Sequence, residues 1–277
     1  MSTAAGATGS GASGRAPGRG RARLLQANST VAFVLAAVVV VTLHETAHAV
    51  AGLALGLTPT LYANAVGYEP EPGRTAAVVT AAAGPLSSLV LGLLVHLFTR
   101  STGRGFGRLF WLWTGLLALQ NFAGYLVIAP FARAGDTGQV FALLALPGAA
   151  YVLAVVVGAA LMLANARLLA AQVVRYATSP DELRHTVLFP WLLGSAVVVV
   201  LTLLDASRSS LDPGSSTVIV AGAATVGIFA PMFSFFYRRL DRPYERLDLR
   251  RPLGPVVVTV LAALAVFTLL APGLRLG

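Results

Sequence analysis

The chain has 277 residues, of which 56% are hydrophobic and only 11% are charged. Soluble domains carry about 25% charged residues, so this composition excludes an ordinary soluble protein and predicts a polytopic membrane protein. The absence of cysteine excludes disulfides and thiolate-bound metal. The 20 basic residues are all arginine, and no basic patch is interleaved with aromatic residues. We therefore expect the lipid bilayer, and no nucleic acid, as a partner.

Residues 1–28 are rich in Gly, Ser and Arg and are expected to form a disordered tail. Apolar segments follow, each near the ~20 residues that cross a bilayer, and they predict an all-α transmembrane bundle of about six to seven spans. A multi-pass protein of the cell membrane is therefore expected. An amphipathic segment at 166–185 is expected at the membrane surface. The predicted spans are 30–56, 75–99, 108–130, 139–165, 186–204, 216–237 and 253–272.

The chain is expected to divide after residue 145. Residues 29–145 contain the motifs described below, and residues 146–277 add further spans with an Arg-rich loop at 238–251, which is expected to contact anionic headgroups. If the N-terminus is cytoplasmic, sixteen of the 20 arginines fall in cytoplasmic loops. Membrane proteins concentrate basic residues on that side, so we expect a cytoplasmic N-terminus.

The sequence His44-Glu45-Thr46-Ala47-His48 lies inside the first apolar segment. Ionisable side chains are costly in hydrocarbon, so such a cluster indicates a functional site. Helical residues four apart share one face, which lets both imidazoles bind one metal ion. Glu45 lies beside them, where it can accept a proton from water, so the motif predicts a hydrolytic zinc site. The alternative is a pair of interhelical hydrogen-bonding histidines with a helical glutamate.

A catalytic zinc site uses three protein ligands and keeps one position open. The chain has no cysteine and only four histidines, so we expect a carboxylate as the third ligand. Asp136 lies between the third and fourth apolar segments, on the same membrane side as the outer end of the first. It could instead be a turn residue or a helix N-cap. Four further candidates, expected nearer the surface, are Glu69, Glu71, His96 and His185.

Three sequence elements occur in the order found in a known family. They are HETAH at 44–48, Ala83-Gly84-Pro85-Leu86-Ser87-Ser88, and Asp136 followed by Gly138 and Gln139. Through these three elements, roughly residues 30–145 of the chain resemble the site-2 protease family of intramembrane zinc metalloproteases. Two departures are Thr137, which separates the aspartate from the glycine, and Asn121, which precedes Asp136 by fifteen residues where the family has about eight.

The resemblance implies a zinc-dependent peptidase that cleaves membrane-spanning substrates, either a single-span protein or a signal-peptide remnant. It implies zinc ligation by His44, His48 and Asp136, with Glu45 as general base. The residues that it places at the substrate are Asn121, Gly84 and Pro85.

Hydrolysis in a bilayer requires a polar cavity, and we expect non-helical structure at Gly84-Pro85 and at 135–138. Two other functions remain open. One is a catalytically inactive relative that binds membrane helices. The other is a membrane transporter or metal carrier in which His44 and His48 form a transit site.

Overall fold

The structure, a computed structural model, describes residues 17–98, 103–132, 135–209 and 244–277. Six helical segments in these ranges are long and apolar enough to cross a membrane. Exposed Leu and Val side chains cover their outer faces, as contact with lipid requires. The predicted all-α transmembrane fold is confirmed, while the predicted span 216–237 lies outside the described residues. The long helices are α1 (Pro17–Ala54), α2 (Arg74–Phe98), α3 (Phe106–Ile128), α5 (Gly148–Val173), α7 (Phe189–Arg208) and α10 (Leu253–Ala265).

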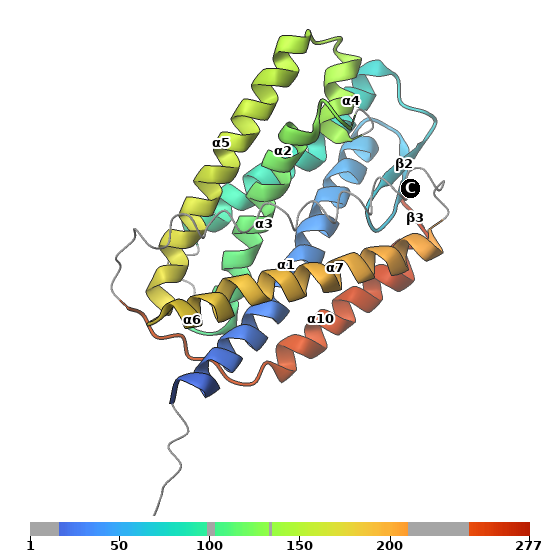
Figure 1. Ribbon diagram of the computed structural model, residues 1–277. Helices are drawn as coiled ribbons and strands as arrows, with labels where there is room; N and C mark the ends of the chain where they lie inside the picture. Colours follow the sequence, from blue (N-terminus) through green and yellow to red (C-terminus); the bar gives the residue numbers. More distant parts are fainter. Residues whose placement is uncertain (1–16, 99–102, 133–134, 210–243) are drawn as a thin grey trace, which may run out of the picture.

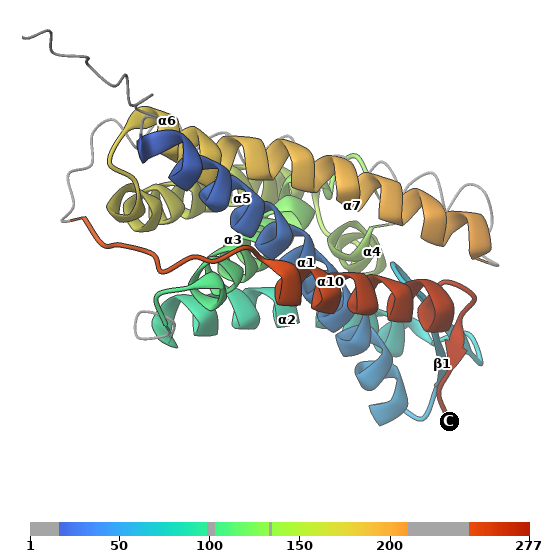
Figure 2. The same cartoon turned by 90° about the horizontal axis from the view of Figure 1, so that it is seen from below.

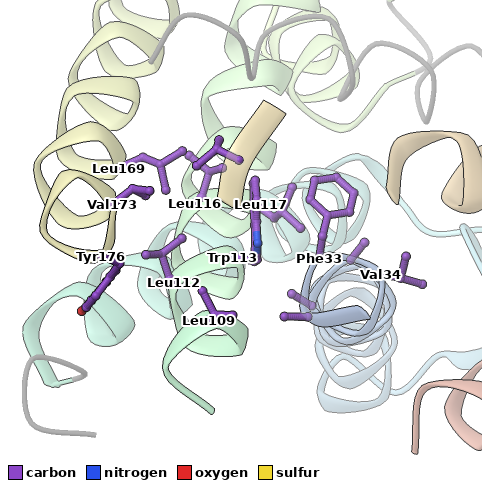
Figure 3. Close-up of a cluster of buried hydrophobic side chains, with 14 of the residues drawn as sticks. Phe33, Val34, Leu109, Leu112, Trp113, Leu116, Leu117, Leu169, Val173 and Tyr176 are labelled. Carbon is purple, nitrogen blue, oxygen red and sulfur yellow. The ribbon is translucent and has the colours of Figure 1, made fainter. Parts of the chain in front are cut away.

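Helix α1 passes diagonally through the bundle and contacts α2, α3, α7 and α10 (Figure 2). Phe33 of α1 and Trp113 of α3 meet edge to face, with ring centroids 4.9 Å apart (Figure 3). The Trp113 indole donates a hydrogen bond to the Ser29 hydroxyl at 2.8 Å, so its one polar atom is satisfied although the ring is fully buried. This core includes Leu169 and Val187 and therefore extends across the expected division at residue 145.

The expected disordered tail is wrong for residues 17–28, which form the first turns of α1. Buried residues recur three or four positions apart, at Ala22, Leu25 and Ser29, so this part of the helix has one face in the core. The Asn28 side-chain amide also donates to the Arg250 carbonyl at 2.9 Å. Residues 1–16 lie outside the described residues.

The segment 166–185, expected at the membrane surface, consists of the end of one long helix and the start of the next, and its place relative to the membrane stays a prediction. Helix α5 continues to Val173, and α6 (Pro180–Leu183) runs through a π-helical turn, Arg184–Leu188, into α7. Ser179 accepts a hydrogen bond from the Glu182 backbone N–H, and the Glu182 carboxylate accepts one from the Thr178 backbone N–H. These two bonds cap the first turn of α6 and explain why the helix begins here.

The fourth predicted span, 139–165, is two helices. The short helix α4 (Asp136–Leu143) ends before Ala145, whose φ of 52° lies in the left-handed region, and α5 begins after Pro147. A non-glycine residue in that region interrupts a right-handed helix. Helix α4 packs against α2 and α3, which places its first residue, Asp136, at the interior of the bundle. Helix α4 is therefore separate from the membrane span formed by α5.

Charged residues gather at the end of the bundle where α1 starts. The Arg21 guanidinium lies 3.1 Å from the Glu182 carboxylate, and Arg175 lies 2.9 Å from Glu245. The described part of the Arg-rich loop, residues 244–251, runs along this end, beside α6 (Figure 1). The HExxH sequence lies toward the opposite end of α1. The cytoplasmic placement of the arginine-rich end stays a prediction.

A small antiparallel sheet, absent from the all-α prediction, follows α1. Gly56, with φ of 76°, ends the helix, and the sheet order is β2-β1-β3. Tyr68 of β2 covers Gly52 of α1, where a β-carbon would lie 2.5 Å from the ring, and its hydroxyl donates to the His48 carbonyl at 3.1 Å. The sheet therefore fixes the last turns of α1. Its strands are β1 (Thr58–Leu61), β2 (Val66–Glu69) and β3 (Leu274–Arg275).

Candidate metal centre

Helix α1 presents His44, Glu45 and His48 to the inside of the bundle. Their exposed fractions are 2%, 6% and 6%. The helical spacing of four puts the two imidazoles on one face, and their Nε2 atoms lie 3.1 Å apart. Three polar side chains so deeply buried in an apolar bundle need specific partners, since unpaired polar groups are expensive there.

Asp136 meets the two histidines from a different part of the chain. Its Oδ2 lies 2.9 Å from His44 Nε2 and 3.3 Å from His48 Nε2. Gly135 is the N-cap of α4, and the Asp136 carboxylate makes no cap, so the turn or N-cap interpretation is wrong. The structure thus brings together the three residues that the sequence suggested as ligands, and these three form a group able to hold a metal ion.

The three facing atoms have the spacing of a metal ligand set. Their separations are 2.9, 3.1 and 3.3 Å. Ligands bound tetrahedrally to zinc at ~2.05 Å lie about 3.3 Å apart, so the spacing of the three atoms fits donors that share one ion. The donor set, two imidazoles and one carboxylate, is one that catalytic zinc sites use, and the fourth position would remain open.

The outer nitrogens of both rings are held by helix α2. His48 Nδ1 lies 2.6 Å from the Thr80 carbonyl oxygen, which can only accept, so Nδ1 carries the hydrogen and donates. In the neutral ring, Nε2 then presents a lone pair to His44 and Asp136. His44 Nδ1 lies 3.0 Å from the Ser88 hydroxyl, which can accept in the same way. Such outer partners select the tautomer that binds metal through Nε2.

Gly84 lies directly against the two Nε2 atoms. A β-carbon at this position would overlap His48 Nε2 and lie 2.6 Å from His44 Nε2. Thr80, Gly84 and Ser88 are four residues apart and form one stripe on α2 that faces the histidines. Helix α2 is continuous through Gly84-Pro85, so the non-helical structure expected there is wrong. Helix α4 includes residues 136–138, so only Gly135 of that segment is non-helical.

The carboxylate of Asp136 has a pKa below its usual range. Burial disfavours the charged form and by itself would raise the pKa, but without a metal ion the protonated forms of His44 and His48 donate hydrogen bonds and supply positive charge that outweigh burial. Because its pKa is lowered, the ionised Asp136 carboxylate stabilises the fold at pH values above the ordinary pKa of about 3.9. This stabilisation is lost as the pH falls through the lowered pKa. At neutral pH Asp136 is therefore an anion facing two imidazoles, as a cation site requires.

The structure does not bring the other candidate ligands to this cluster. Glu69 pairs with Arg275 at 2.9 Å. His96 Nδ1 lies 2.9 Å from the Gly92 carbonyl, and His185 Nδ1 lies 2.7 Å from the Gln26 side-chain oxygen. Among the described residues, the metal-binding group contains neither these three nor Glu71.

Asn121 lies on α3, one turn before Tyr125. The substrate-binding roles expected for Asn121, Gly84 and Pro85 stay predictions.

Sequence reasoning missed three residues around the cluster. Thr80 and Ser88 hold the histidines, and Tyr125 of α3 stacks on the His44 ring with centroids 5.3 Å apart. The first two could have been found, because each lies four residues from Gly84 on one helical face. Nothing local distinguishes Tyr125, which reads as part of an apolar span.

The Tyr68 hydroxyl gives a pH-dependent prediction for stability. Burial raises the pKa of Tyr68 to about 12, and the charges of Glu45 and Asp136 act in the same direction. The neutral, hydrogen-bonded phenol of Tyr68 therefore stabilises the fold fully at pH values below its ordinary pKa of about 10. This stabilisation is lost as the pH rises through the pKa of Tyr68 in the folded protein.

We expect Tyr68→Phe to be less stable by about 1 kcal/mol at pH 8. The difference should shrink as the pH rises from about 10 toward about 12, because the unfolded phenol ionises first. Thermal unfolding in detergent measures both values, with Tyr151→Phe as a control that removes a hydroxyl away from the sheet. A difference that is unchanged at the alkaline end would contradict the buried hydrogen bond.

Comparison of the chain with protein-family models, with curated proteins and with solved structures finds no match. The case for a function therefore depends on the cluster itself and on the sequence elements that surround it.

Proposed function

We propose that the chain is a zinc-dependent intramembrane peptidase. The observation that carries the proposal is the convergence of His44 Nε2, His48 Nε2 and Asp136 Oδ2 within 3.3 Å of one another, inside a bundle of apolar helices. The resemblance of the three sequence elements to site-2 proteases supports the same activity.

The residues divide the reaction between them. His44, His48 and Asp136 would hold the ion, which would supply Lewis-acid chemistry for the scissile carbonyl and for water. Glu45 follows His44 directly, and its carboxylate lies close enough to His44, His48 and Asp136 to interact electrostatically with all three. Its carboxylate accepts the proton of the attacking water and delivers it to the leaving amine.

The substrate is proposed to be a membrane-spanning segment, such as a single-span protein or a signal-peptide remnant. A helix in lipid satisfies its own peptide groups, so the segment must unwind locally before cleavage. The ligand side chain with the greatest exposure is Asp136, at 21%, against 2% for His44 and 7% for His48. We therefore expect the substrate to approach from the side of α4.

The test is cleavage in liposomes that contain the purified chain and a panel of tagged single-span helices. We expect fragments, identified by mass spectrometry, that disappear with a zinc chelator and return with added zinc. His48→Ala is the inactive control. Zinc uptake into the vesicles without fragments would contradict the peptidase and favour a metal carrier, and helix binding without fragments would favour an inactive relative.

A further inference from the structure

We propose that Tyr125 is a positioning residue of the metal centre, whose ring orients His44 and supports the segment that carries Asp136. The inference deepens the proposed function and rests on it, because it assigns a role toward the same ion.

The first observation is the stacking of two rings. The planes of Tyr125 and His44 are 9° from parallel, with centroids 5.3 Å apart, whereas His44 and His48 meet at 77°. A flat stack fixes the plane of the His44 ring but leaves rotation about its own axis open. The Ser88 hydroxyl, 3.0 Å from Nδ1, fixes that second degree of freedom. Together the two contacts determine where His44 Nε2 points.

The second observation is the contact between Tyr125 and the segment that carries Asp136. Tyr125 lies one turn before α3 ends at Ile128, and the chain then reverses to begin α4 at Asp136. The β-carbon position of Gly135 lies 3.8 Å from Tyr125 Cε1, so the ring packs against the residue before the ligand. The same side chain therefore contacts one ligand on α1 and the support of another on α4.

Both of these contacts come from the ring of Tyr125, so the ring carries the positioning role. Loss of comparable outer contacts weakens metal binding by about 10–100-fold.

Two substitutions separate the ring from the hydroxyl. Tyr125→Phe keeps the ring and removes only the hydroxyl, and Tyr125→Leu removes the ring. Tyr151, whose ring meets Phe141 at 5.2 Å away from the cluster, provides the matched controls Tyr151→Phe and Tyr151→Leu. The probe is Co²⁺ alone, titrated into metal-free protein in detergent, because its visible absorption reports both affinity and ligand geometry.

We expect Tyr125→Leu to bind Co²⁺ about tenfold more weakly and with altered absorption bands, while Tyr125→Phe, which keeps the ring, and both Tyr151 variants stay near the wild type. Equal loss in Tyr125→Leu and Tyr151→Leu would show a general packing effect and overturn the inference. Wild-type affinity and bands in Tyr125→Leu would overturn it while leaving the metal site intact. No Co²⁺ binding by the wild type would overturn the proposed function as well.

Discussion

Glu45→Gln is expected to abolish peptide cleavage while the chain keeps its metal. The amide is nearly the same size as the carboxylate but cannot accept a proton, so water loses its general base. General bases contribute about 10²–10⁴-fold to rate, and the loss should fall in kcat. The three proposed ligands are unchanged, so zinc content should stay near the wild-type value. Cleavage in liposomes and metal analysis of the same preparation measure both.

Glu182→Gln is the matched control. Glu182 is as buried as Glu45, at 6% exposure, but its carboxylate accepts a hydrogen bond from the Thr178 backbone N–H at the start of α6. The same substitution there should alter stability and leave the rate per folded molecule unchanged. Wild-type turnover by Glu45→Gln would exclude the proposed base. Loss of zinc together with activity would mean that Glu45 serves the site structurally.

Gly84→Ala is expected to eliminate metal binding with a single added methyl group. That methyl would overlap His48 Nε2 and lie 2.6 Å from His44 Nε2, the two atoms proposed to face the ion. Helix α2 would have to move away from α1, which would also pull the Thr80 and Ser88 contacts from the rings. We expect zinc to fall from about one ion per chain to a small fraction of that, since both the ligands and their outer partners are displaced.

Gly92→Ala separates this effect from crowding in general. Gly92 lies on the same helix two turns later, and a β-carbon there would lie 2.6 Å from the Leu119 side chain. The variant should lose stability through overpacking but keep its zinc. Equal zinc content in the two glycine variants, measured on protein that elutes as a single species, would contradict the placement of the ion beside Gly84.

Much of this arrangement follows from local sequence. HExxH on a helix necessarily places His44 and His48 on one face, and apolar length identifies six of the helices. Asp136 was a candidate because the junction that carries it faces the outer end of the first helix. Its approach to His44 depends on the break at Ala145, where a left-handed backbone residue separates α4 from α5. Hydropathy does not reveal such a break.

The features that escaped prediction depend on contacts between distant segments. Strands β1 and β2 have four residues each, too few for an alternating pattern to stand out. They are held by tertiary contacts, chiefly Tyr68 on Gly52. Residues 17–28 looked unstructured because their composition is polar, yet Leu25 and Asn28 are buried against partners far away in the chain. Tyr125 is distinguished only by the ring that it covers.

The most direct test of the central claim is the zinc content of the chain purified in detergent without chelators. The wild type is compared with His44→Ala, His48→Ala and Asp136→Ala, and Asp205→Ala serves as a control at a buried aspartate outside the cluster. We predict about one zinc per chain in the wild type and in the control, and a clear loss in each of the three variants. A wild type that takes up no zinc even when supplied with it, or an Asp136→Ala variant that keeps all of it, would contradict the three-ligand site.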